Sequence, residues 1–373
     1  MLPPKISYSQ LKIATFNLFN YLEPPNAYYE FERIYSLEQW QKKQHWIANY
    51  LNEYQPDIIG FQEVFSIESL KALVEKQGYS HFAVVDEPHI EDDFIYSKPV
   101  VAIASKFAII QTNSVKVNNE LASLIGLSDE FSFTRQLLRA TIDIPHLGHT
   151  DCYVVHFKSK RSMIEYHEQN ANQSAEKTII ETLKAQVVGG WGSTVQRGSE
   201  ATLLMAEIIS RREQTQYPII LLGDFNHPLD DGVLNQLLTN TLRFASTSDC
   251  DKYLAKYCLQ DAWQLSQKVA LNNTTYANKN HEKLDGNTLL VSNSREANQQ
   301  KTAERIPTHY FAGKGSVLDY ILLSCEFDAS YHNSLYQVSN HQTYDKHLIN
   351  PIFDYDGEST DHGIVLVTLT LRS

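Results

Sequence analysis

Amide, carboxylate and imidazole side chains stand at the ends of several apolar runs in this sequence. They are Asn17, Glu63, His156, Asp224, Asn226, Asp319, Asp361 and His362. Each has an ordinary explanation alone, because Asp and Asn favour turns and a histidine in an apolar strand is commonly a hydrogen-bonded core residue. Their joint placement points elsewhere, since ligands of open α/β sheets bind beyond the carboxyl ends of the strands. We therefore expect these side chains to line one cleft.

Two pairs among these residues indicate the chemistry of a metal-assisted hydrolase. Glu63 and Asp361 offer hard carboxylate oxygens, the ligand type that Mg²⁺ or Mn²⁺ prefers. His362 beside a buried Asp319 would be an oriented imidazole that can take a proton from water. A Lewis acid, a general base and groups that stabilise charge around phosphorus are what hydrolysis of a phosphate ester requires.

The remaining candidates could position the water and the phosphate. Asp224 and Asn226 could orient the attacking water and donate a hydrogen bond to a non-bridging oxygen. The positive donors for a phosphate would be Lys158, Arg139, Arg197 and His156.

The segment from His156 to Arg161 concentrates positive charge in an acidic chain. The formal net charge is −12, from 32 Lys and Arg against 44 Asp and Glu, which argues against binding nucleic acid with the whole surface. A local basic cleft is compatible with this balance. Lys160 and Arg161 either face solvent or continue a phosphate track beyond the scissile position, which a nucleic-acid strand needs and a small phosphomonoester does not.

The elements that must position these residues are strands buried on both faces, since the runs are apolar at nearly every position. The runs are KIATFNL near Thr15, DIIGFQEV from Asp57, VVAIAS from Val100, RATIDI from Arg139, CYVVHF from Cys152, YPIILLGDF from Tyr217, VLDYILLS from Val317 and HGIVLVTLTL from His362. Helical patterns lie between them. A capping box of Ser36 and Gln39 starts the first helix, Ser66 and Gly78 bound a second, and a third runs through 203–212. This alternation predicts layered α/β architecture with mixed sheets.

Composition and length indicate a globular chain that forms a single domain. With 42% hydrophobic and 20% charged residues, a wholly disordered, collagen-like or coiled-coil chain is excluded. No boundary divides residues 1–373 into separate domains, and the polar segments 163–197 and 272–305 are expected to be long surface loops or insertions. The 4 cysteines are too few for a disulfide scaffold, although Cys250 and Cys258 could pair in an oxidising compartment.

The sequence also bears on location. No apolar run approaches the ~20 residues that span a bilayer, so no transmembrane segment is expected. The first residues, MLPPKISYSQ, have no signal-peptide core. We therefore expect a cytoplasmic protein, or a secreted or periplasmic one if a leader has been removed.

The order of the motifs resembles the endonuclease/exonuclease/phosphatase family, which includes DNase-I-like nucleases. ATFNLFN, PDIIGFQEV, VVHFKSK, GDFN, LDYILLS and TDH follow one another from Asn17 to His362, so the resemblance covers nearly the whole chain. It implies a four-layer α/β/β/α sandwich of two mixed sheets with the active site at one rim. The Tyr-rich motif of the abasic-site endonuclease branch is missing, which disfavours that branch. Thr360 stands where the commoner last motif has Ser.

The same resemblance implies a role for each candidate residue. The metal ligands would be Glu63, Asn17 and Asp361. Water alignment and transition-state stabilisation would fall to Asp224 and Asn226. The general base would be His362, oriented by Asp319. The scissile phosphate would be contacted by His156.

Three functions are compatible with these residues. The first is a divalent-metal-dependent nuclease, a phosphodiesterase that cleaves DNA or RNA. The second is a phosphatase of a small phosphorylated molecule, such as an inositol phosphate, a lipid headgroup or a nucleotide. The third is a catalytically silent binding protein on the same fold, which is disfavoured because none of the six family motifs is degraded. Because a fold does not settle function by itself, the choice of nucleic acid as substrate depends on the positive run.

Overall fold

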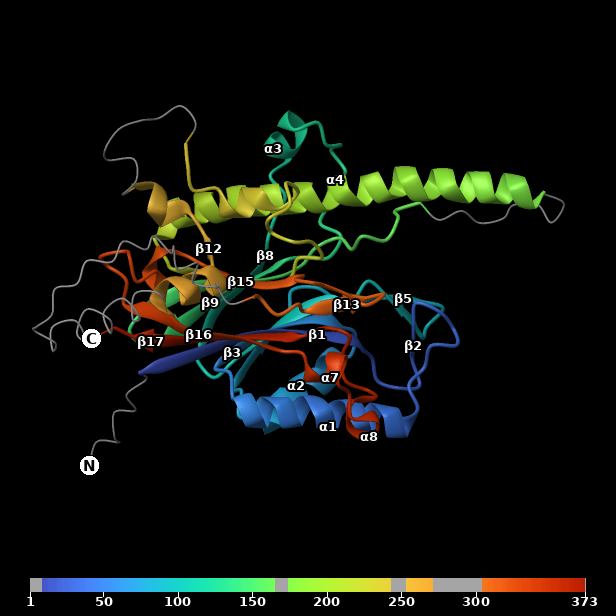
Figure 1. Ribbon diagram of the computed structural model, residues 1–373, viewed down its shortest axis with the longest axis horizontal. Helices are drawn as coiled ribbons and strands as arrows, with labels where there is room; N and C mark the ends of the chain where they lie inside the picture. The colour runs from blue at the N-terminus through green and yellow to red at the C-terminus, as the bar shows by residue number, and fades with distance from the viewer. Residues whose placement is uncertain (1–8, 165–173, 243–252, 271–303, 373) are drawn as a thin grey trace, which may run out of the picture.

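Two six-stranded sheets lie face to face at the centre of the computed structural model, with helices on the outer side of each (Figure 1). The structure describes residues 9–164, 174–242, 253–270 and 304–372. Each sheet combines parallel and antiparallel neighbours. The predicted four-layer α/β/β/α sandwich with two mixed sheets is therefore confirmed.

The first sheet has the strand order β16-β17-β1-β3-β7-β4. Its members are β16 (Tyr336–Tyr344), β17 (Ile364–Leu371), β1 (Gln10–Tyr21), β3 (Ile58–Val64), β7 (Val100–Ser105) and β4 (His81–Ala83). β1 and β3 run parallel, with Asn17 beside Gln62 in the register. The ends of these two strands therefore meet at the same edge of the sheet.

The second sheet has the order β12-β15-β11-β10-β9-β8. Its members are β12 (Gln260–Asp261), β15 (Asp319–Leu323), β11 (Ile219–Asp224), β10 (Gly148–His156), β9 (Leu138–Ile144) and β8 (Ile109–Ser114). β10 and β11 are parallel, and Asp224 is paired with His156 on one side and with Asp319 on the other. One row across this sheet thus holds three of the predicted site residues.

The interface between the sheets is a continuous apolar core that includes Ile13, Ile58, Val154 and Leu222. The two sheets are in close contact at Gly60 in β3. A Cβ atom at this position would lie 2.1 Å from Leu222 Cδ1, closer than any real contact. Glycine is required here because the opposite sheet occupies the space of a side chain.

Helices α1 (Leu37–Tyr54) and α2 (Ile67–Lys76) cover the outer face of the first sheet. The predicted capping box is present, since Ser36 accepts from the Gln39 backbone and the Gln39 side chain accepts from the Ser36 backbone. The second helix also lies where it was predicted, and Gly78 after it has φ +90. The buried face of α1 packs aromatic and aliphatic side chains on the sheet.

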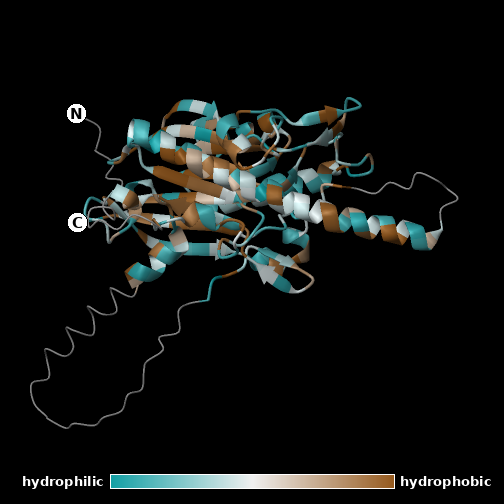
Figure 2. Ribbon diagram, turned by 90° about the horizontal axis from the view of Figure 1, so that it is seen from above, coloured by the Kyte–Doolittle hydropathy of each residue, from teal (hydrophilic) through white to brown (hydrophobic). Residues whose placement is uncertain are grey.

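Helix α4 (Ala175–Thr215) covers the second sheet and is 41 residues long. The third predicted helix is its C-terminal part, but the prediction of a surface loop at 163–197 is wrong from Ala175 onward. Glycines 189, 190 and 192 lower helix propensity there and hid the helix in the sequence. Gly189 has a packing reason, because a Cβ would lie 1.9 Å from Ser162 Oγ. The N-terminal half of α4 extends beyond the sheets, with apolar residues on its surface (Figure 2).

The shorter elements include β2 (Ala27–Tyr28), β5 (His89–Glu91), β6 (Ile95–Ser97), α3 (Asn119–Leu124), β13 (His309–Phe311), β14 (Lys314–Ser316), α7 (Lys346–Ile349), α8 (Phe353–Asp356) and the 3-10 helices η1 (Asn235–Leu238), η2 (Ala255–Tyr257) and η3 (Cys325–Phe327). The second predicted insertion, 272–305, and Cys250 lie almost wholly outside the described residues. Within the described ranges, none of the helices combines the length and the apolar character of a bilayer-spanning segment.

Candidate active site

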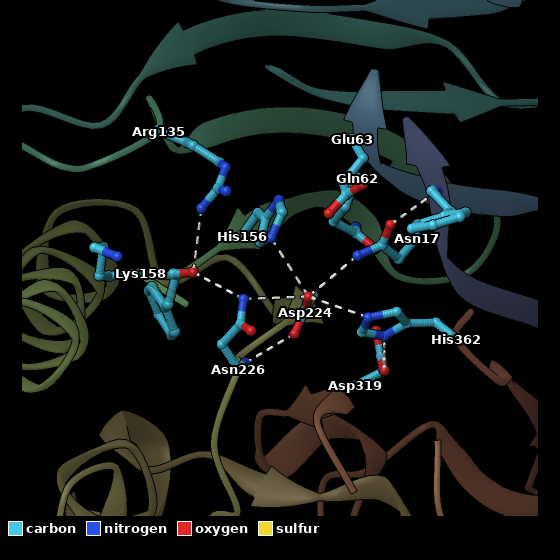
Figure 3. Close-up of polar contacts among 12 residues, drawn as sticks. Asn17, Gln62, Glu63, Arg135, His156, Lys158, Asp224, Asn226, Asp319 and His362 are labelled. Atoms are coloured by element: carbon cyan, nitrogen blue, oxygen red, sulfur yellow. Dashed lines mark hydrogen bonds and ion pairs between the residues drawn. The ribbon is translucent and has the colours of Figure 1, made fainter. Parts of the chain in front are cut away.

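Asp224 lies at the centre of a polar cluster where the two sheets meet (Figure 3). Its Oδ2 accepts hydrogen bonds from Nδ2 of Asn17 at 3.1 Å and from Nδ2 of Asn226 at 3.2 Å. The Nε2 atom of His156 lies 3.4 Å from the same oxygen. Asn17 belongs to the first sheet and Asp224 to the second, so the cluster joins both sheets at one edge.

Asp319 and His362 form a hydrogen-bonded pair beside Asp224. Nδ1 of His362 lies 2.8 Å from Asp319 Oδ2. Because a carboxylate can only accept, Nδ1 carries the hydrogen and Nε2 is the nitrogen that faces Asp224 Oδ2, at 3.8 Å. The pair is the Asp-oriented imidazole that the sequence suggested, and a neutral His362 in this tautomer can accept a proton at Nε2.

The buried groups of the cluster shift one another's pKa values. Burial lowers the pKa of His362, but the Asp319 and Asp224 carboxylates outweigh it and raise that pKa well above its usual value. Burial raises the pKa of the Asp224 carboxyl, although His362 opposes the shift. Burial and the positive charges of Arg135 and His362 hold the pKa of His156 well below its usual value. His156 is thus a neutral imidazole, and its Nδ1 has no partner among the described residues.

Glu63 and Asp361 supply the carboxylates that could hold a divalent cation. Burial and the negative charge of Asp361 raise the pKa of the Glu63 carboxyl, so a cation between them would relieve an unfavourable interaction. Oδ1 of Asp361 is buried and has no hydrogen-bond partner among the described residues. This unsatisfied hard oxygen, together with the Glu63 carboxylate, fits Mg²⁺ or Mn²⁺. Asn17 instead uses both ends of its amide, accepting from the Phe19 backbone at 3.1 Å and donating to Asp224.

Strained backbone surrounds the cluster. Glu63 has φ 60 and Asn226 has φ 55, and in β1 Phe19 and Asn20 have φ 53 and 55. Side-chain-bearing residues rarely adopt this left-handed region, and such residues gather at sites where the surrounding structure holds them for a function. At Asn226 the turn directs the amide back to Asp224 and to the carbonyl of Phe157, at 3.0 Å.

The predicted phosphate donors have different positions. Arg197 is buried in α4 and donates to the carbonyl of Lys158 at 2.9 Å, so it supports the loop that follows β10. The Lys158 ammonium folds back onto the carbonyl of Arg161 at 3.0 Å. Lys160 and Arg161 are exposed on the same loop. The positively charged segment from His156 to Arg161 therefore lies beside the cluster, and the buried Arg197 holds its backbone in place.

Arg139 does not join the cluster. It lies in β9, where its guanidinium pairs with Glu207 of α4 at 3.3 Å and with Asn113 at 3.1 Å. These contacts are on the outer face of the second sheet, where Arg139 connects the sheet to its helix. The prediction that it donates to phosphate is corrected for this reason.

Two residues near the cluster were missed in the sequence. Arg135 precedes β9 and points toward the cluster, with its Nη1 3.4 Å from the carbonyl of Phe157 and its Nε without a partner among the described residues. His309 in β13 forms a bridge with His362, and the two rings are 5.2 Å apart. Neither residue ends an apolar run, so the positional signal that identified the others was absent.

Comparisons with known proteins agree with this architecture. The model of the endonuclease/exonuclease/phosphatase family matches residues 14–341. The human nocturnin catalytic domain with bound sulfate has a TM-score of 0.53 at 14% identity, over 98% of this chain and 95% of that one. A humanised D. rerio TDP2 has a TM-score of 0.50 at 11% identity, over 97% and 99%. Truncated Caenorhabditis elegans TDP2 has 0.50 at 12%, over 97% of each chain. The comparison with curated proteins found no match.

Proposed function

Because the chain belongs to the endonuclease/exonuclease/phosphatase family, we propose that it is a divalent-metal-dependent phosphodiesterase that cleaves DNA or RNA by attack of water. Members of this family hydrolyse phosphoester bonds. One observation carries the proposal: the buried Asp319–His362 pair faces Asp224, and the partly exposed carboxylates of Glu63 and Asp361 lie beside it. A fixed base beside a set of hard oxygen ligands is the arrangement that phosphoester hydrolysis needs.

Each side chain has a distinct task in this proposal. Glu63 and Asp361 would hold Mg²⁺ or Mn²⁺, which when bound supplies a Lewis acid that polarises a phosphoryl oxygen. His362 accepts the proton of the attacking water at Nε2 while Asp319 holds Nδ1 and stabilises the charged ring. Hydrogen bonds from Asn17 and Asn226 fix the Asp224 carboxylate, which would accept a hydrogen bond from the water and so align it.

The donors around the phosphate follow from the unpartnered nitrogens. Asn226 would donate to the charge that develops on the non-bridging oxygens by exchanging one of the two Nδ2 hydrogen bonds that it makes to Asp224 and to the Phe157 carbonyl. Arg135 offers its Nε–H, and His156 can donate from Nδ1 when that nitrogen carries a proton; both atoms are buried and without a partner among the described residues. Polar groups so placed favour a ligand that accepts hydrogen bonds, and a phosphate provides such acceptors.

Support for nucleic acid as the substrate comes from the exposed positive charges of Lys160 and Arg161 beside the cluster. Each backbone phosphate that a protein neutralises adds about 0.7 to 0.9 to the slope of log affinity against log salt. A nuclease that uses both residues should bind oligonucleotide more weakly as salt rises, and Lys160→Ala/Arg161→Ala should flatten that dependence. The matched control is Lys71→Ala/Lys76→Ala on α2, which removes the same charge on the far side of the first sheet.

The deciding measurement compares a phosphodiester with a phosphomonoester. Chelator-treated protein should be inactive, and added Mg²⁺ or Mn²⁺ should restore cleavage of an oligonucleotide and of bis(p-nitrophenyl) phosphate in preference to p-nitrophenyl phosphate. A better monoester activity, together with an unchanged salt slope in Lys160→Ala/Arg161→Ala, would replace the nuclease with a phosphatase of small molecules. Full turnover without metal would overturn the carboxylate site.

A further inference from the structure

A pocket of about 500 Å³ opens next to the catalytic cluster. Three aromatic residues, Phe19, Tyr28 and Tyr35, contribute to its wall, and its lining extends to Asp361. Asp361 is also within 4.0 Å of His362. A group attached to a phosphate at the cluster can therefore reach this pocket. Apart from Asp361, the lining residues have no role in the proposed reaction.

The backbone holds Phe19 at the junction between the cluster and the pocket. Phe19 and Asn20 are consecutive left-handed residues, with φ 53 and 55. The amide of Phe19 donates to Asn17 Oδ1 at 3.1 Å, and the amide of Asn20 donates to Glu63 Oε2 at 2.9 Å. Strain of this kind persists only where neighbouring contacts hold it. The turn thus fixes the Phe19 side chain relative to the residues that would hold the metal.

Lys43 supports the Phe19 ring from the protein interior. Its ammonium lies 5.7 Å from the centroid of Phe19 and 5.5 Å from that of Tyr35. Lys43 is 1% exposed, whereas Phe19 is 38% exposed. An aromatic ring that is fixed by its backbone and open to a pocket can serve as a stacking platform, because every nucleobase has a π-face.

We propose that this pocket binds the base of a nucleotide next to the scissile phosphate, stacked on Phe19. The inference rests on the proposed nuclease function and deepens it. The volume falls in the range of small-ligand pockets. Among the described residues, the Lys43 ammonium makes one hydrogen bond, to the carbonyl of Ser359 at 2.8 Å, so it can also donate to a base carbonyl. Glu358 in the lining can accept from a base amino group.

A second phosphate fits the pocket less well than a base. The lining contains the carboxylates of Glu32, Asp356, Glu358 and Asp361 against the positive charges of Arg33 and Lys43. An anionic group would meet an excess of negative charge, and a neutral heterocycle would not. The charge of the lining therefore favours the base over another part of the nucleic acid.

The test uses a dinucleotide, since it has one scissile phosphate and two bases. Cleavage of thymidylyl-thymidine is compared with that of two analogues, each lacking one base. We expect loss of one particular base to lower kcat/KM roughly 5- to 150-fold through KM, the range of one base–aromatic stack. Phe19→Ala should lower kcat/KM for the intact dinucleotide by a similar factor. For the analogue that lacks the stacked base, kcat/KM should be nearly the same in Phe19→Ala and in the wild type. Phe19→Leu should be intermediate, and Phe353→Ala, 89% exposed on α8, should match the wild type.

Binding measured by calorimetry on chelated protein separates this inference from the proposed function. Cleavage of all three substrates with equal kcat/KM, unchanged in Phe19→Ala, would overturn the base pocket and leave the nuclease intact. Binding that depends on one base and on Phe19, without cleavage, would support the pocket and overturn the nuclease. Neither cleavage nor base-dependent binding would overturn both.

Discussion

At the level of single residues, His362 is the group on which catalysis should depend most. It is buried, its Nδ1 is held by Asp319, and its Nε2 faces the cluster. We expect His362→Ala to lower kcat by about 10²–10⁴, and Asp319→Asn to lower it less, because the imidazole remains. Steady-state kinetics on an oligonucleotide would measure both effects. The control is His45→Ala, which removes an exposed histidine of α1.

The pH profile tests the same pair. The Asp319 carboxylate helps to raise the pKa of His362 well above its usual value, and only the neutral imidazole can accept a proton. The rate should therefore rise with pH through the pKa of His362. In Asp319→Asn that pKa falls, so the acidic limb of the kcat profile should move to lower pH while the maximum decreases. A limb that stays at the same pH would assign the base to another residue.

The buried position of Lys43 leads to a prediction about how stability depends on pH. Burial lowers its pKa to about 8, against about 10.4 in an unfolded chain. Between these values the unfolded state binds more protons, so the free energy of unfolding due to Lys43 rises with pH. From pH 7 to pH 9.5 the wild type should gain about 2 kcal/mol relative to Lys43→Met. Denaturant titrations of both proteins at the two pH values would show this, and an equal difference at both would contradict the titration of Lys43.

The catalytic and metal-binding residues that the sequence identified share one property: each lies at or next to the end of an apolar run. Asn17, Asp224 and His362 were found in this way, and they meet in space. Arg135 precedes its strand, and Arg139 lies within the same strand with its side chain on the outer face. Strand alternation decides which face a side chain occupies, and without the register the sequence could not assign the arginine.

At the level of elements, the close contact between β3 and β11 should determine how much substitutions at Gly60 and Leu222 lower the free energy of unfolding. Gly60→Ala would place a methyl group against Leu222, at a buried contact of 2.1 Å, and overpacking of this kind costs about 1–3 kcal/mol. Leu222→Ala alone should cost about 2–5 kcal/mol. The double variant should be less destabilised than the two costs together, because each change relieves the other. Denaturant unfolding would measure the cycle.

A matched control uses a glycine that has open space. Gly190 in α4 has no atom within 4 Å of an added Cβ. Gly190→Ala should therefore raise stability by up to about 1 kcal/mol through helix propensity. If Gly60→Ala were as well tolerated as Gly190→Ala, the sheets would not be in the close contact described.

The sequence predicted the central strands better than the edge strands and α4. All eight apolar runs become strands, among them β1, β11 and β17. Edge strands such as β16, YQVSNHQTY, are partly solvated and carry polar residues, so they lack the continuous apolar signature. In α4 the outer half has little to pack against, and its apolar residues are exposed, so no core-facing pattern distinguished it from a polar loop.

At the level of the whole molecule, the two sheets each supply part of one site. Asn17 and Glu63 come from the first sheet, and His156, Asp224 and Asp319 come from the second. The motif order predicted this convergence, because the family resemblance implied an active site at the rim shared by both sheets. The pocket beside Phe19 could not be predicted in the same way, since it depends on a strained turn and on a lysine from α1.

A site shared by two sheets should make metal binding visible in the stability of the whole fold. A cation held by Glu63 and Asp361 binds the folded state and stabilises it by about 1.4 kcal/mol at tenfold excess over Kd. Mg²⁺ should then raise the Tm of chelated protein by about 1–3 °C, given the small shift per kcal/mol in larger proteins. Glu63→Ala should abolish this rise, although its own Tm without metal should be equal or higher, because burial and Asp361 disfavour the charged Glu63. Glu68→Ala, an exposed carboxylate at the start of α2, should keep the full Mg²⁺ response. A response of equal size in Glu63→Ala would place the cation elsewhere.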